Sequence, residues 1–210
     1  WKDEKNDTPK KRVGWAGNKN HPKKGSTHIV SPITEINHIN KIKEMLLHNP
    51  RNYALFTVGI NTGLRASELC LLKKKDVKDL QPGDVLKIKQ PKTKKFRDVT
   101  FNRSSIEAIK NLLLKKPELR DNQQLFSGRK GAISTITICA LVKKWCKEIN
   151  LPHNYGSHTL RKTFGYHQRV THKIGIEELM KIFGHSSPSQ TMTYICVQPE
   201  EIKAVYMNDI

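Results

Sequence analysis

The sequence predicts a mainly α-helical fold with one small antiparallel β-hairpin sheet, which places it in the α+β class. Between residues 34 and 197, apolar residues recur at intervals of three and four, the period of a helix that packs one face against a core. One stretch, from residue 85 to residue 101, instead alternates apolar and polar residues on both sides of a basic turn. The length of 210 residues is enough for one sizeable domain with an extension.

Two helices are predicted in the region from residue 34 to residue 62. Thr34 is the expected N-cap of the first helix, and Pro50 lies beyond its end. The apolar face of this helix consists of Ile36, Ile39, Ile42, Met45 and Leu46. An apolar run from Tyr53 to Ile60 predicts the second helix, which leads into Asn61-Thr62-Gly63. The leucines that follow Gly63 are spaced to face a core, and they place Arg65 near the start of a further helix.

The hairpin is predicted after the turn sequence Gln81-Pro82-Gly83-Asp84. Leu86 and Ile88 alternate with lysines on its first strand, and Val99 and Phe101 alternate with polar residues on its second. The segment between the strands, residues 90–95, contains three lysines, so the sequence predicts a hairpin with a basic tip.

Five helices are predicted after the hairpin. Ser104 to Glu107 fits a capping box at the start of the first of them, which Pro117 closes. A helix from Thr135 to Ile149 follows, and glycines separate the three shorter ones. These shorter segments are Thr159–Thr171, Ile176–Phe183 and about Pro188–Val197.

The charge of the chain indicates an anionic partner. There are 38 Lys and Arg against 19 Asp and Glu, which gives a formal net charge of +19. Nucleic acid is the expected partner, ahead of an anionic membrane surface, because each Lys or Arg facing a phosphate releases a condensed counterion. No apolar stretch is long enough to span a membrane, and no export signal is visible, so a cytoplasmic protein associated with the nucleoid is expected. The four cysteines lack paired spacing, which predicts reduced thiols in the core and no metal site.

Four short clusters carry residues that can hold or attack a phosphate. They are Arg65 with Glu68, Lys92 in the hairpin tip, His158-x-x-Arg161, and Gly184-His185 followed by Tyr194. A spacing of three puts His158 and Arg161 on one face of a helix, where both could reach the same anion. Arginine suits this task because its planar guanidinium donates two parallel hydrogen bonds to phosphate oxygens.

These clusters resemble, in order and spacing, the catalytic domain of the tyrosine recombinases, the phage integrase family. The matching strings are Thr62-Gly63-Leu64-Arg65-Ala66-Ser67-Glu68-Leu69, Lys92-Thr93-Lys94-Lys95-Phe96-Arg97-Asp98-Val99, His158-Thr159-Leu160-Arg161-Lys162-Thr163-Phe164, and Gly184-His185-Ser186-Ser187 through Thr191 to Tyr194. The resemblance covers roughly residues 31 to 197. It implies the integrase catalytic-domain fold, which is related to the type IB topoisomerases.

The resemblance also implies a role for each matching residue. Tyr194 would attack a DNA phosphate and form a 3′-phosphotyrosyl bond, with no cofactor and no metal. Arg65 and Arg161 would hold the nonbridging oxygens. Lys92 would protonate the departing 5′-oxygen, although Lys94 or Lys95 could take that part. His158 would assist proton transfer, His185 would donate a hydrogen bond to the phosphate, and Glu68 would support Arg65. The residues expected to contact DNA are Lys94, Lys95, Arg97 and Lys162.

Three regions are expected along the chain. Residues 1–30 form a basic arm or linker, either a disordered tail or an arm that tracks the DNA backbone. Residues 31–197 form the catalytic domain, and residues 198–210 form a C-terminal tail that packs either on its own domain or on a neighbouring protomer. Most members of the resembled family carry an N-terminal core-binding domain, so the chain is either a fragment or a reduced version. Double-stranded DNA is the expected partner, with a monomer in isolation and a homotetramer on synapsed DNA.

Two other functions fit part of the sequence. A type IB topoisomerase-like enzyme would share the chemistry but would relax supercoils without recombination. A DNA-binding accessory protein with vestigial catalytic residues would need only the charge. A ribosomal or RNA-binding protein would explain the charge of +19 but not the four ordered clusters.

Overall fold

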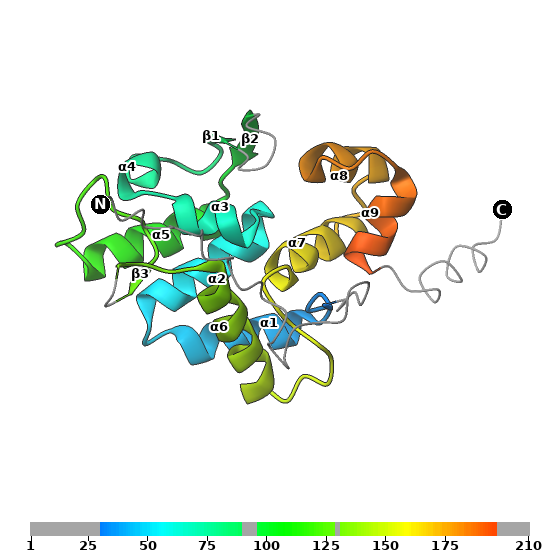
Figure 1. Ribbon diagram of the computed structural model, residues 1–210, viewed down its shortest axis with the longest axis horizontal. Helices are drawn as coiled ribbons and strands as arrows, with labels where there is room; N and C mark the ends of the chain where they lie inside the picture. The colour runs from blue at the N-terminus through cyan, green and yellow to red at the C-terminus, as the bar shows by residue number, and fades with distance from the viewer. Residues whose placement is uncertain (1–29, 90–95, 129–130, 197–210) are drawn as a thin grey trace, which may run out of the picture.

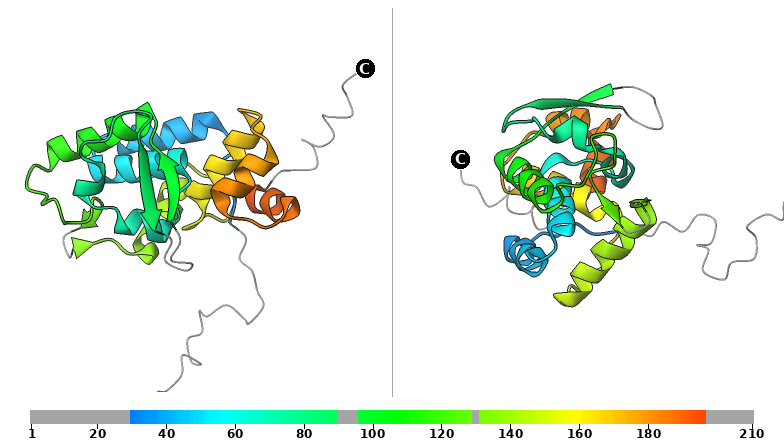
Figure 2. Two further views of the ribbon diagram at one scale, coloured as in Figure 1. Left: turned by 90° about the horizontal axis from the view of Figure 1, so that it is seen from above. Right: turned by 90° about the vertical axis from the view of Figure 1, so that its left-hand side faces the viewer.

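The computed structural model describes residues 30–89, 96–128 and 131–196. The helices surround a buried central helix, α2, and one β-hairpin projects from the assembly (Figure 1). In Figure 1, α5 and β3 lie at the left and α7, α8 and α9 at the right. Viewed from above, the hairpin faces the viewer and crosses the domain near its middle (Figure 2, left). The predicted α+β class, mainly helical with a small antiparallel sheet, is confirmed.

Helix α2 (Pro50–Thr62) forms the centre of the domain, and α1 (Ile36–Leu46) packs beside it. Most of α2 is buried because its apolar residues face neighbours on several sides, including α5 and α7. The Asn49 side chain caps its start by accepting a hydrogen bond from the Asn52 backbone N–H. Gly63 ends it in the left-handed conformation, at φ 59°. A side chain at Gly63 would also strike the ring of Phe164, 2.6 Å from the position of its Cβ.

The chain after α2 forms two short helices and then the predicted hairpin. The helices are α3 (Ala66–Leu71) and α4 (Lys74–Val77). Strands β1 (Val85–Lys89) and β2 (Phe96–Thr100) pair antiparallel, with Val85 opposite Thr100 and Lys89 opposite Phe96. Ile88 and Val99 are buried, as the alternation predicts. The basic tip, residues 90–95, lies outside the described residues.

Helix α5 (Arg103–Lys115) begins differently from the prediction. Its N-cap is Asn102, whose side chain accepts a hydrogen bond from the Ser105 backbone N–H, so the capping box predicted at Ser104–Glu107 is wrong. Asparagine is among the strongest N-cap residues, and the helix therefore starts earlier than the box suggests. A second hairpin that the sequence did not predict follows, with β3 (Ser127–Gly128) paired to β4 (Gly131–Ala132), and α6 (Thr135–Glu148) comes next.

The last three described helices are α7 (Thr159–Val170), α8 (Ile176–Phe183) and α9 (Pro188–Ile195). They build a second, smaller apolar cluster from Leu179, Phe183 and Ile195, apart from the main core around α2. Gly165 of α7 faces this cluster, and a Cβ placed there would lie 2.6 Å from atoms of both Phe183 and Ile195. Close packing of the three helices therefore depends on a residue without a side chain.

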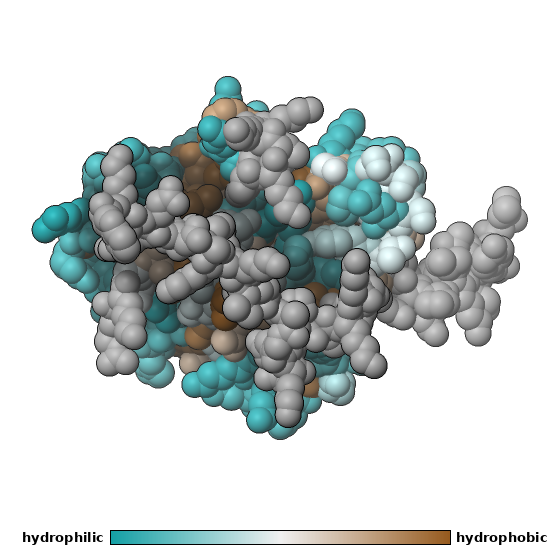
Figure 3. All heavy atoms as spheres, in the orientation of Figure 1, coloured by the Kyte–Doolittle hydropathy of each residue, from teal (hydrophilic) through white to brown (hydrophobic). Residues whose placement is uncertain are grey.

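The structure also bears on the predictions about the cysteines, membrane spans and the two terminal segments. All four cysteines are free thiols, but only Cys146 is fully buried, so the others are half-buried rather than core residues. None of the helices in the described part of the chain has the length and apolar character needed to span a bilayer. On the face drawn in Figure 3, hydrophilic residues form much of the described rim, and hydrophobic residues lie mainly inside it. The predicted arm and tail lie outside the described residues, apart from residue 30.

The packing of α7 predicts the effect of Gly165→Ala. In an open helix this change would stabilise the protein by up to about 1 kcal/mol. Here the added methyl group overlaps two buried side chains, and overpacking of this kind costs about 1–3 kcal/mol. We expect the free energy of unfolding, measured in urea, to fall by about 1 kcal/mol or more. Lys144→Ala, at an exposed position of α6, is the control and should change it by less than about 0.5 kcal/mol.

Candidate active site

Arg65 and Glu68 occupy the start of α3 and bind each other. Arg65 is the N-cap residue, and its backbone N–H donates to Glu68 Oε2 at 2.7 Å. Its side-chain Nη1 donates to Glu68 Oε1 at 3.0 Å. The Glu68 side chain is fully buried, whereas the Arg65 side chain is 33% exposed. One carboxylate therefore both caps the helix and fixes the direction of a guanidinium that reaches the surface.

Arg97, on β2, binds the same carboxylate from the other side. Its Nη2 lies 2.8 Å from Glu68 Oε2, and its Nη1 donates to the Ile182 carbonyl at 3.4 Å. Burial alone would raise the pKa of the Glu68 carboxyl. The hydrogen bonds from Arg97 and Arg65 and their positive charges outweigh that effect and hold the pKa below its usual value. Glu68 is therefore a carboxylate at neutral pH, and it joins the hairpin to α3.

Arg161 is buried on α7, and backbone carbonyls hold it. Its guanidinium donates from Nη1 to the Gly63 carbonyl and from Nη2 to the Phe183 carbonyl at 3.1 Å. Arg65 Nη2 donates to the same Phe183 carbonyl at 3.3 Å. The Phe183 ring also lies under the Arg161 guanidinium, 4.5 Å from centroid to Cζ. Burial lowers the pKa of Arg161 to about 10, so the side chain stays charged at neutral pH.

Tyr194 lies on α9 with its hydroxyl 3.2 Å from His158 Nδ1. The His185 ring packs edge-on against the tyrosine ring, with centroids 5.1 Å apart, and its own Nδ1 is 2.9 Å from the Thr191 hydroxyl. Desolvation raises the pKa of Tyr194 above its usual value, although the nearby charges of Arg161 and Arg65 oppose the rise. Desolvation and the same two arginines lower the pKa of His185. At neutral pH both groups are therefore uncharged.

Lys162 also lies beside the tyrosine rather than on an open surface. It is 6% exposed, and its Nζ lies 5.2 Å from the centroid of the Tyr194 ring. The same Nζ is 3.3 Å from Cys196 Sγ, just beyond the end of α9. An ammonium group over the face of an aromatic ring is attracted by the ring's quadrupole, so Lys162 holds the tyrosine ring from one side.

The structure brings six predicted residues into one site: Arg65, Glu68, His158, Arg161, His185 and Tyr194. Lys92, Lys94 and Lys95 lie outside the described residues, so their roles stay predictions. Arg97 and Lys162, which the sequence suggested as DNA contacts, are both placed at this site. Sequence reasoning missed the carbonyls of Gly63 and Phe183, because a backbone acceptor leaves no mark in the residue pattern.

The arrangement suits a reaction at a phosphate. A guanidinium has five N–H donors. Arg65 and Arg161 each use two of them on the carboxylate or the carbonyls, so each guanidinium is anchored and still has further N–H groups. A neutral phenol and an imidazole lie next to them. Among the described residues, no group of three or more His, Cys, Asp or Glu side chains is arranged to hold a metal ion.

Comparison with known proteins identifies the family of the chain. A model of the phage integrase family matches residues 33–201. The chain belongs to the phage integrase family. Within this family, it is 37% identical over 183 residues to the probable integrase/recombinase YoeC of Bacillus subtilis strain 168, covering 85% of the chain and 96% of YoeC. It is 34% identical over 157 residues to the tyrosine recombinase XerC of Caldanaerobacter subterraneus subsp. tengcongensis, covering 73% of the chain and 43% of XerC.

Solved structures of recombinases share the fold of this integrase domain. The crystal structure of XerA recombinase superposes with a TM-score of 0.71 at 25% identity, covering 89% of the chain and 66% of XerA. XerH recombinase bound to its difH substrate superposes with a TM-score of 0.69 at 21% identity, covering 89% of the chain and 55% of XerH. The integrase domain thus spans nearly all of YoeC but about half of the longer relatives.

The buried Glu68 predicts a pH-dependent loss of stability. Because its pKa is lower in the folded protein than in the unfolded chain, Glu68 contributes stability above its unfolded pKa of about 4.3 and loses that contribution as the pH falls through the folded value. We expect Glu68→Gln to reduce the free energy of unfolding at pH 7 by about 2 kcal/mol or more, since two arginines lose their anion.

The same variant should show a flatter stability profile below about pH 4, because the titrating group is gone. Urea unfolding at a series of pH values measures both effects. Parallel acid profiles for wild type and Glu68→Gln would show that other carboxyls control the acid transition.

Proposed function

We propose that this chain is the catalytic part of a site-specific DNA recombinase that cleaves and rejoins strands through a 3′-phosphotyrosyl intermediate. The observation that carries the proposal is the contact between the Tyr194 hydroxyl and His158 Nδ1, 3.2 Å apart, beside two anchored arginines. A nucleophile, a proton acceptor and phosphate-binding cations are thereby gathered in one place. That combination is what metal-free phosphoryl transfer requires.

The chemical step transfers a DNA phosphate to the tyrosine. The Tyr194 oxygen forms a bond to phosphorus while the bond from phosphorus to the 5′-oxygen breaks. The phenol proton passes to His158 Nδ1, and the departing 5′-oxygen takes a proton from Lys92. Because the phosphotyrosyl bond is itself a phosphodiester, a 5′-hydroxyl can later attack it and restore the DNA backbone without an energy source.

The arginines stabilise the charge that develops on the phosphate. Arg161 and Arg65 already share the Phe183 carbonyl, so their positions are fixed before DNA arrives. Because the two guanidiniums are already in position, they need little reorganisation during the reaction. Such preorganisation of charges is the main source of electrostatic catalysis. His185, held by the Thr191 hydroxyl through Nδ1, has its other ring nitrogen available to donate to the same phosphate.

The state of Tyr194 explains why a base is needed. Its raised pKa keeps the phenol protonated in the free protein, where it is a weak nucleophile. A DNA phosphate would draw Arg65 and Arg161 into hydrogen bonds, and His158 would take the proton as the new bond forms. The tyrosine would therefore become reactive only when a DNA phosphate is bound beside the two arginines.

DNA is the partner that this chemistry requires. XerH and the Tn1549 transposon integrase, whose folds this chain shares, were both solved in complex with DNA. The formal charge of +19 favours the same partner. The homotetramer on synapsed DNA stays a prediction.

Replacing the nucleophile provides the direct test. Tyr194→Phe removes the attacking oxygen but keeps the ring that packs against His185 and Phe183. We expect this variant to bind DNA normally and to form no covalent adduct on nicked suicide duplexes, as measured on SDS gels in the presence of EDTA. A covalent adduct that persists in Tyr194→Phe would disprove the assignment. Supercoil relaxation by wild type without recombinant products would favour a topoisomerase-like function instead.

The proton donor can be tested separately from the nucleophile. Lys92→Ala should slow cleavage of an ordinary phosphodiester by roughly 100-fold or more, because the 5′-oxygen leaves poorly without a proton. A substrate with a 5′-sulfur leaving group needs no such proton, so its cleavage should be nearly unaffected. Lys94→Ala and Lys95→Ala serve as matched controls from the same segment, and equal slowing of both substrates by Lys92→Ala would argue against proton donation.

A further inference from the structure

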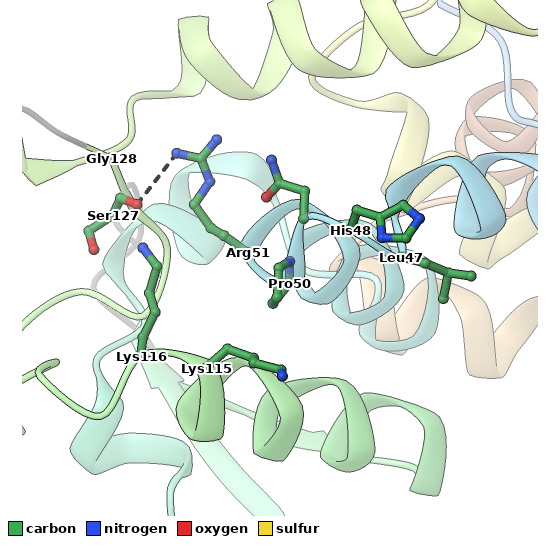
Figure 4. A pocket seen from close by; sticks show the side chains of 9 residues that line it. Leu47, His48, Pro50, Arg51, Lys115, Lys116, Ser127 and Gly128 are labelled. Atoms are coloured by element: carbon green, nitrogen blue, oxygen red, sulfur yellow. Dashed lines mark hydrogen bonds between the residues drawn. The ribbon is translucent and has the colours of Figure 1, made fainter.

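A cationic pocket lies at the opposite end of α2 from the candidate active site. Its volume is about 700 Å³, and it opens between the turn from α1 to α2, the end of α5 and strand β3 (Figure 4). Its nine lining residues are Leu47, His48, Asn49, Pro50, Arg51, Lys115, Lys116, Ser127 and Gly128. Three segments that are distant in the sequence therefore build one depression.

The pocket gathers positive charge without an internal counter-charge. Arg51 and Lys116 point toward Ser127, and Lys115 lies on the α5 side of Pro50 (Figure 4). In the described part of the chain, no Asp or Glu lines the pocket and no ion pair involves these three side chains. Like charges held this close repel one another, so an anion that entered the pocket would relieve the repulsion.

The described hydrogen-bond partners of the Arg51 side chain are neutral groups. Its Nε and Nη2 donate to Asn52 Oδ1 at 3.0 and 2.8 Å, and its Nη1 donates to the Ser127 carbonyl at 3.4 Å. The guanidinium is therefore oriented but not neutralised. A cation with a fixed direction and no carboxylate partner is suited to bind a phosphate oxygen.

We propose that this pocket binds the sugar–phosphate backbone of the DNA duplex, at a position distant from the phosphate that reacts with Tyr194. The proposal rests on the DNA-cleaving function proposed above. The pocket is much larger than a single phosphate ion, and its cations come from different segments, which suits a chain of phosphates. Its lining combines polar and apolar surface with three cationic side chains, so it differs from the mainly apolar lining of a typical small-molecule site.

The length of α2 sets the distance between the two sites. Its 13 residues, at about 1.5 Å each, separate the pocket from the Gly63 carbonyl that holds Arg161 by about 20 Å. One turn of B-DNA covers about 34–36 Å, so a duplex that lies along α2 would span both places. Along one strand, 20 Å corresponds to about six phosphates at about 3.4 Å each. The pocket would therefore bind DNA that flanks the cleavage point.

The test compares two double variants that lose the same charge. Lys115→Gln with Lys116→Gln removes two cations from the pocket. Lys75→Gln with Lys110→Gln removes two exposed cations outside it, one from the same helix α5. Binding of a duplex to each protein is measured from 50 to 300 mM salt. Thermal unfolding of both variants confirms that they are folded.

If both lysines contact phosphates, the slope of log K against log salt should fall by about 1.8 in the pocket variant, because each contact contributes about 0.9. Extrapolated from 1 M salt, this corresponds to about 30-fold weaker binding at 0.15 M salt. The control variant should change the slope by less than half as much. Equal changes in the two variants, or no change in either, would overturn the proposal.

Two further measurements, the yield of covalent adduct and the effect of phosphate on the melting temperature, distinguish a failure of the cleavage function from a failure of the pocket assignment. Covalent adduct is measured at saturating DNA, where the pocket variant should match wild type in yield. Wild type that binds DNA without forming adduct would disprove the cleavage function, whereas normal adduct with unchanged slopes would disprove the pocket alone. Inorganic phosphate that raises the melting temperature of wild type but not of the pocket variant, with equal slopes, would make the pocket a free-anion site and overturn its assignment to DNA.

Discussion

The candidate active site depends on backbone carbonyls at the ends of two helices. Arg161 donates to the Gly63 carbonyl beyond α2, and Arg161 and Arg65 both donate to the Phe183 carbonyl at the end of α8. Arg97 donates to the neighbouring Ile182 carbonyl. The last carbonyls of a helix have no partner within it and carry partial negative charge. These carbonyls thus hold together three cations that would otherwise repel one another. The Glu68 carboxylate binds two of the three, Arg65 and Arg97, and partly neutralises their charge.

Two glycines make this arrangement possible. Gly63 and Gly184 each end a helix in the left-handed conformation, at φ 59° and φ 68°. The chain turns sharply at each glycine, and Arg65 and His185 follow these turns within two residues. Arg65, which follows the turn at Gly63, donates to the Phe183 carbonyl beside the other turn, so the first turn brings a side chain to the carbonyl of the second.

Much of the fold could be predicted from the sequence because helical spacing of apolar residues reflects burial directly. The hairpin and α8 form over the residues where the sequence pattern predicts them. The predicted clusters around Arg65, His158 and Tyr194 lie together in the folded chain. The start of α5 could not be placed, because Asn102 competes with Ser104 as a cap and both are favourable. The second hairpin was missed because its two-residue strands are too short to show alternation.

The sequence predicts which side chains belong to the site but not which partners hold them in place. Arg97 and Lys162 were expected to contact DNA because of the family resemblance, and that contact stays a prediction. The structure also gives each a partner inside the domain that was not foreseen: Glu68 for Arg97, and the Tyr194 ring and Cys196 for Lys162. Such pairs depend on tertiary distances between residues 29 or more positions apart, which no local pattern encodes.

The small apolar cluster under α9 affects how the protein would respond to heat. Among the described residues, its buried members are Leu179, Phe183 and Ile195, whereas the main core around α2 contains many more residues. A region with little buried apolar surface opens at a lower free energy than the rest of its domain. We therefore expect the helix that carries Tyr194 to detach at a lower temperature than α2 unfolds, so that thermal inactivation precedes thermal denaturation.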